Sequence, residues 1–173
     1  ENMAKFKPNA DVELYYDGSK KFETSSTGIS VTGGIVGSTD ATINSITVGK
    51  GANSVNGNTV LGETALDAAV TGGNNVAIGK AALSANTSGN QNIAIGRNAL
   101  LVNTTGIYNV GIGDSTLANN TTANNNVAVG QSALVLNTTG YNNVAVGSFA
   151  LDANTTGIEN VAVGRNALSA ITT

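Results

Sequence analysis

The 173-residue sequence has no cysteine, no histidine and no tryptophan, and it has a single proline. Without cysteine there is no disulfide framework, and without cysteine or histidine the usual zinc ligands are missing. Nucleophilic catalysis by a Ser-His-Asp triad or a Cys-His pair is excluded for the same reason. The few carboxylates of the repeats form no glycosidase-like pair within one chain. We therefore expect a protein that is not an enzyme and that holds no cofactor or metal.

Charged and aromatic residues are also scarce, at 11% and 4% of the chain, and the net charge is −3. No basic run is present, so we expect no nucleic-acid partner. No apolar run approaches the length of a transmembrane helix, so we expect no membrane insertion. Apolar residues still make up 40% of the sequence, and a core must be built from Val, Ile, Leu and Ala.

A repeat of 17 residues is the main feature of the sequence. Six consecutive identical spacings do not arise by chance, and internal repeats of this kind indicate a stacked architecture. The repeat is marked by a glycine that follows a short apolar stretch, at Gly62, Gly79, Gly96, Gly113, Gly130, Gly147 and Gly164.

The apolar stretch before each glycine alternates large, small, large. This period of two with β-branched residues predicts a strand whose two large side chains point to one face and whose small side chain points to the other. From Gly79 onward the first column is Val76, Ile93, Val110, Val127, Val144 and Val161, the second is Ala77, Ala94, Gly111, Ala128, Ala145 and Ala162, and the third is Ile78, Ile95, Ile112, Val129, Val146 and Val163.

The rest of each repeat is equally regular. A leucine stands four residues after each glycine, a polar run of the type Asn-Thr-Thr-Gly follows, and an asparagine precedes every strand. Because Asn and Gly tolerate left-handed backbone angles, the polar run is predicted to be a turn. Each unit is therefore a strand, a glycine corner, a second short strand or bend carrying leucine, and a turn.

A unit of this length is too short to hold a crossover helix and fits one coil of an all-β, parallel β-roll or β-solenoid. Stacked coils lie about 4.8 Å apart, so equivalent residues lie above one another. The aliphatic columns then form a continuous core and the asparagine columns form hydrogen-bonded ladders.

Two segments are expected, residues 1–43 and the repeat array at 44–173. Residues 11–16 and 20–24 alternate around Asp17-Gly18-Ser19, which predicts a β-hairpin, and residues 28–36 predict another strand. At the start of the array, residues 45–49 form a strand unit whose glycine lies only 13 residues before Gly62, which we interpret as a shortened first coil.

The alanine column suggests how separate chains associate. A solvent-facing side of a strand is usually polar, whereas a column of alanine suits the close approach of another surface. We therefore expect a homotrimer in which the alanine column is the interface. A monomeric solenoid with an exposed alanine face is the alternative.

The repeats resemble those of two classes of surface protein. Asn75-Val76-Ala77-Ile78-Gly79 resembles the repeat in the heads of trimeric autotransporter adhesins, which form left-handed parallel β-rolls. The longer unit at residues 143–157 also resembles repeats of bacteriophage tail-fibre and tail-spike proteins, and residues 12–24 are similar to segments of marine phage fibres. The adhesin repeat is usually shorter than 17 residues.

The resemblance implies a structural segment of a homotrimeric phage virion fibre, a rigid shaft or head that supports host attachment. Other virion fibre components and a host-surface glycan or protein would be its partners, and the virion its location. The alternatives are the head of a trimeric adhesin on a bacterial cell surface, which binds host or matrix, and an ice-binding solenoid with a threonine ladder. Adjacent threonines in a strand point to opposite faces, which argues against a flat two-row threonine array.

Three aromatic residues interrupt the array, and they are the candidate ligand-binding residues: Tyr108, Tyr141 and Phe149. Exposed aromatic rings could stack on a sugar or on a receptor surface. The alternative, which we favour, is that they pack against a neighbouring chain or turn.

Overall fold

The computed structural model describes residues 4–6, 12–16, 18–25, 28–31, 41–43 and 46–172. The chain divides into two compact units, Glu1–Ser38 and Thr39–Thr173. In the part of the chain that is described, one short 3-10 turn, η1 (Ala52–Ser54), is the only helical element beside the strands. The prediction of an all-β protein is confirmed.

The first unit is a small antiparallel sheet. Among the described residues it has four strands in the order β1-β2-β3-β4, and β2 pairs antiparallel with β3 across a register shift between Leu14 and Tyr15. Residues 32–36 of the strand expected at 28–36 lie outside the described residues. The strands are β1 (Ala4–Phe6), β2 (Val12–Tyr16), β3 (Ser19–Ser25) and β4 (Gly28–Val31).

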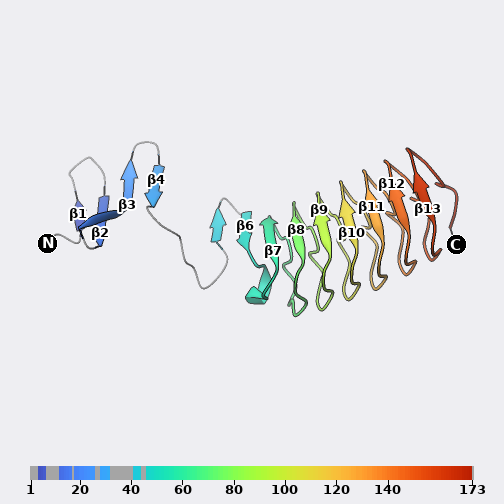
Figure 1. Cartoon of the computed structure of the whole chain (residues 1–173), viewed down its shortest axis with the longest axis horizontal. Coiled ribbons are helices and arrows are strands. Elements are labelled where there is room, and N and C mark those ends of the chain that lie inside the picture. The colour runs from blue at the N-terminus through green and yellow to red at the C-terminus, as the bar shows by residue number, and fades with distance from the viewer. Residues whose placement is uncertain are drawn as a thin grey trace. The chain divides into compact units, whose positions relative to one another are not determined.

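The second unit is a β-solenoid in which each strand lies directly above its equivalent in the next repeat. Val76 pairs with Ile93, and Ile93 with Val110, so the register advances by one 17-residue repeat per strand. About six coils stack in this way, and Figure 1 shows their strands side by side. The predicted β-solenoid is confirmed. Its strands are β5 (Ala41–Ile43), β6 (Ile46–Gly49), β7 (Thr59–Gly62), β8 (Val76–Ile78), β9 (Ile93–Ile95), β10 (Val110–Ile112), β11 (Val127–Val129), β12 (Val144–Val146) and β13 (Val161–Val163).

The start of the array differs from the prediction. Residues 46–49 do form a strand, but β6 pairs antiparallel with β7, and β5 pairs antiparallel with β6. The expected shortened coil is therefore wrong, because the chain reverses direction between β6 and β7. The antiparallel β6 covers the edge of the parallel sheet, which would otherwise present unpaired backbone groups. The expected boundary between residues 43 and 44 falls between β5 and β6, which belong to one sheet.

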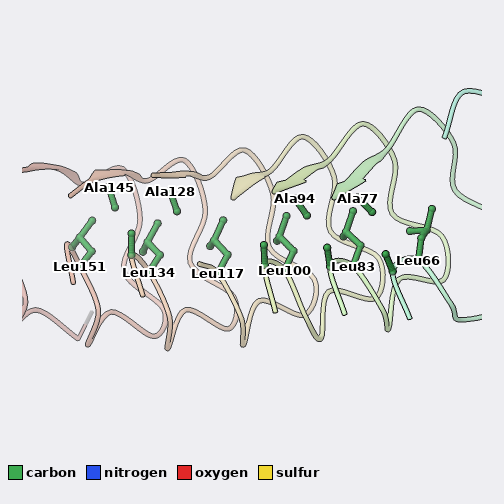
Figure 2. Packing of buried hydrophobic residues seen from close by; sticks show 14 of the residues in the cluster. Leu66, Ala77, Leu83, Ala94, Leu100, Leu117, Ala128, Leu134, Ala145 and Leu151 are labelled. Carbon is green, nitrogen blue, oxygen red and sulfur yellow. The ribbon is translucent and has the colours of Figure 1, made fainter. Parts of the chain in front are cut away.

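The interior of the roll is a row of leucines facing a row of alanines (Figure 2). The leucines from Leu66 to Leu151 are fully buried, and so are the central strand residues Ala77, Ala94, Ala128 and Ala145. The expectation of an outward alanine column is therefore wrong. The two layers of the roll are so close that one methyl group fills the space: a Cβ added at Gly111 would lie 3.6 Å from Leu100 Cδ1.

The leucine column has an unusual backbone. The buried leucines from Leu66 to Leu151 have φ between 47° and 52°, in the left-handed region. A left-handed conformation costs roughly 1–2 kcal/mol for a residue with a side chain, whereas complete burial of a leucine contributes about 1.5–3 kcal/mol. Burial therefore outweighs the strain at each coil.

The Asn-Thr-Thr-Gly run bends the chain, as predicted for a turn. The expectation that its Asn and Gly have left-handed backbone angles is wrong. The positive φ values lie elsewhere in the coil, two, four and twelve residues after the corner glycine. The asparagine of this run contributes its side chain instead. Asn103 Nδ2 donates to Asn86 Oδ1 at 3.1 Å and to the Gly106 carbonyl at 3.1 Å.

The asparagines form two buried ladders, as predicted. In the ladder before the strands, Asn92 Oδ1 accepts from the backbone N of Asn109 at 2.9 Å and from its Nδ2 at 3.2 Å. The second ladder runs through the Asn-Thr-Thr-Gly runs and ends at Asn154, because the next coil has Ile171 at this position. The buried Asn154 Oδ1 has no hydrogen-bond partner among the described residues.

Candidate functional site

The outer face of the parallel strands carries two columns of β-branched aliphatic side chains. Because the central alanine of each strand points inward, the β-branched residues on either side point outward. Their own neighbours above and below cover part of each side chain, and Ile93, Ile112 and Val146 still expose 37–38%. We call this surface the aliphatic stripe: Val76, Ile78, Ile93, Ile95, Val110, Ile112, Val127, Val129, Val144, Val146, Val161 and Val163.

The aliphatic stripe continues from β8 onto β7 and β6. Leu61 of β7 is 45% exposed, and Val48 of β6, which lies opposite it in the antiparallel register, is 40% exposed. With about 4.8 Å between strands, the seven described strands β7–β13 extend this face for about 29 Å. A contiguous aliphatic face without a charged side chain is typical of a protein interaction site.

A column of mixed charge borders one edge of the stripe, one residue after each corner glycine. Lys80 Nζ lies 3.0 Å from Glu63 Oε2 and Arg97 Nη2 lies 2.6 Å from Asp114 Oδ2, so two ion pairs link adjacent coils. The Ser115 hydroxyl and the Arg97 guanidinium lower the pKa of Asp114 from its ordinary value. All four charged side chains are at least one-third exposed, so each pair contributes at most about 1 kcal/mol.

A second column borders the other edge, three residues before the first stripe residue of each coil. We call it the upstream corner column. Its polar members bond to the preceding coil: Asn124 Oδ1 accepts from the backbone N of Ile107 at 2.7 Å. Tyr141 and Ile158 are 44% and 43% exposed at the same position. The column consists of Gly73, Asn90, Ile107, Asn124, Tyr141 and Ile158.

The three predicted ligand-binding aromatics do not come together. Tyr141 lies in the upstream corner column, whereas Tyr108 directly follows Ile107 of that column. The two tyrosines are two coils, or about 10 Å, apart along the stack. Phe149 lies two residues after the corner glycine Gly147, at the other edge of the strand, and is half-buried. They form no single aromatic platform.

The threonine ladder has two different rows. The inner threonines bond along the stack, as Thr104 Oγ1 donates to the Thr121 carbonyl at 3.1 Å. The outer row, with Thr105 and Thr122, is exposed. The hydroxyls of the two rows therefore do not form one flat array.

Sequence reasoning missed the aliphatic stripe because it placed the large residues inside. One signal could have found it. The invariant leucine already supplies a large interior side chain in every coil, which leaves room for only a small residue opposite it.

The described residues offer no metal site and no membrane-spanning helix. Among residues 46–172 and the shorter described segments, no group of three or more His, Cys, Asp or Glu side chains could hold a metal ion. No helix within the described residues is long and apolar enough to cross a membrane. Comparison with protein-family models, with curated proteins and with solved structures found no match. The aliphatic stripe is therefore the site from which a function can be argued.

Proposed function

We propose that this chain is a rigid segment of a homotrimeric virion fibre, which supports a host-attachment part of the particle. The observation that carries the proposal is the aliphatic stripe. A face of this kind would remain in contact with water on a lone chain, and burial of aliphatic surface is the main driving force for association.

A second copy of the same chain is the partner that best fits the stripe. Its side chains repeat at the coil spacing of about 4.8 Å, and an identical stripe presents the same spacing. The stripe has no aromatic ring and no charge, which are the groups that anchor sugars and anionic ligands. Three stripes around a common axis would bury one another, in accord with the trimeric assemblies that the repeats resemble.

The internal bonding of the roll supports a mechanical role. Each coil is tied to the next by backbone hydrogen bonds on both layers, such as Val110 N to the Asn126 carbonyl at 2.8 Å and Leu100 N to the Thr116 carbonyl at 2.9 Å. The two asparagine ladders add buried bonds between the same coils. Bending the array would break several of these bonds at once, which gives stiffness. A trimer would also present three copies of any host-binding part, so weak individual contacts with the host surface would add up to a stronger overall attachment.

The wider context belongs to the same proposal. Other fibre components and a host-surface glycan or protein would be the partners, and the virion the location. The alternative is the head of an adhesin on a bacterial surface, which shares the repeat and the stripe. Ice binding gains no support, because the hydroxyls of the inner row, such as those of Thr104 and Thr121, donate to the next coil and do not join the outer row in one flat array.

Absolute mass by light scattering on a size-exclusion column tests the proposal. The native chain of 17.2 kDa is expected at three times its mass. The double variant Ile112→Lys/Val129→Lys places two charges in the centre of the stripe and is expected to be monomeric. The matched control Gln131→Lys/Ser148→Lys adds the same charge beside the stripe and should stay trimeric. A monomeric native chain with a folded circular-dichroism spectrum would refute self-association.

A further inference from the structure

We propose that Ile107, Tyr141 and Ile158 fix the axial alignment of the copies that pack through the aliphatic stripe. This inference rests on the proposed self-association. It concerns a property that the stripe cannot supply by itself, namely which coil of one chain lies beside which coil of the next.

The stripe is nearly uniform along the stack. Its first column is valine except for Ile93, and its third column contains only Ile and Val. A neighbouring chain shifted by one coil, about 4.8 Å, would meet almost the same side chains and lose only the contacts of one end coil. Alignment is poorly specified wherever a surface repeats without change.

The upstream corner column breaks this uniformity. From coil to coil it is Gly, Asn, Ile, Asn, Tyr and Ile. No shift by one coil places this series on itself, because a shift brings Asn90 to the position of Ile107 and Asn124 to that of Tyr141. The column therefore carries the information about alignment that the stripe lacks.

The position of the column is suited to this task. It lies three residues before the stripe, and the residue that follows it is left-handed, with φ of 58–59° at Tyr108, Asn142 and Glu159. The corner is held in place, since Glu159 N donates to the Tyr141 carbonyl at 3.1 Å. Tyr141 and Ile158 are 44% and 43% exposed, and Ile107 is half-buried.

The large side chains are not needed for the coil itself. Where asparagine stands in this column, it accepts a hydrogen bond from the preceding coil, as Asn90 Oδ1 does from Gly73 N at 2.9 Å. The triple variant Ile107→Asn/Tyr141→Asn/Ile158→Asn thus restores the arrangement of the repeat and should fold. A matched control is Leu136→Asn, which removes a side chain that is 48% exposed and lies away from the stripe.

Disulfide trapping tests the proposal, since the chain has no cysteine of its own. Chains with Val127→Cys are co-expressed with chains that carry Ile112→Cys, Val129→Cys or Val146→Cys, which differ by one coil each. A disulfide needs Cα atoms within roughly 4.4–6.8 Å, so a shift of one coil changes which pair is linked. The yield of each linked pair and the mass of each assembly are measured.

In the native background and in Leu136→Asn, one of the three pairs is expected to exceed the others by about tenfold. In the triple variant at least two pairs should form in comparable yield, while the mass stays that of the native assembly. The same single preferred pair in the triple variant would overturn this inference alone, as would a triple variant that is monomeric, or an oligomeric native chain in which no pair is linked. A monomeric native chain would instead overturn the proposed function.

Discussion

Asn109 lies in the middle of a fully buried ladder, and its replacement by alanine is a sharp test of how the coils are held together. Its Nδ2 donates to Asn92 Oδ1 at 3.2 Å and to the Ala123 carbonyl at 2.8 Å. Its Oδ1 accepts from the backbone N of Asn126 at 3.0 Å and from the Asn126 Nδ2 at 3.3 Å.

The loss in the free energy of unfolding caused by Asn109→Ala depends on which buried groups keep a hydrogen-bond partner. Asn92 Oδ1 still accepts from the backbone N of Asn109, and the Ala123 carbonyl still accepts from Asn120 Nδ2. The backbone N–H of Asn126 and one N–H of its side chain would be left buried and unpaired. A buried donor without a partner costs about 1–3 kcal/mol, so the expected loss in the free energy of unfolding is about 2–6 kcal/mol.

Urea unfolding followed by far-ultraviolet circular dichroism measures this loss, at one protein concentration because association shifts the apparent stability. Asn109→Leu fills most of the volume but leaves the same two donors unpaired, so it should be about as unstable as Asn109→Ala. The control Asn119→Ala removes an exposed side chain with one bond to the Val135 carbonyl and should cost no more than about 1 kcal/mol. A loss below about 1 kcal/mol for Asn109→Ala would refute the structural role of the ladder.

Two further predictions concern packing and charge. A Cβ at Gly111 would lie 3.1 Å from Thr116 Oγ1, so Gly111→Ala should lower the free energy of unfolding by about 1–3 kcal/mol. Thr116→Ala removes the atom that the new methyl group meets, so in the double variant much of this loss should be recovered. Additive effects of the two substitutions in a double-mutant cycle would contradict the prediction. The Ser115 hydroxyl and the Arg97 guanidinium lower the pKa of Asp114 from its ordinary value of 3.8. Its contribution to stability, at most about 1 kcal/mol, is therefore fully present above that ordinary value and is lost as the pH falls through the lowered pKa of the folded state. Urea unfolding at pH 7 and pH 3 should therefore show a smaller acid loss for Asp114→Asn than for the native chain.

The sequence determined the coil. The spacing of the glycines gave the 17-residue unit, and the alternation in Val76-Ala77-Ile78 gave the strand. The asparagine before each strand was sufficient to predict a ladder, because equivalent residues must stack in a parallel solenoid. All of these are consequences of a period, and a period can be read from one chain.

Only the tertiary structure decided which side of the strand is inside. Alternation separates Ala77 from Val76 and Ile78 but does not say which face is buried, and hydrophobicity alone favours the larger residues. The distance between the two layers settles the question, because each buried leucine leaves room for one methyl group opposite it. The antiparallel start at β6 was likewise beyond the sequence, since a strand pattern carries no direction. The aliphatic stripe, the site on which the proposed assembly depends, exists because the narrow interior excludes its residues.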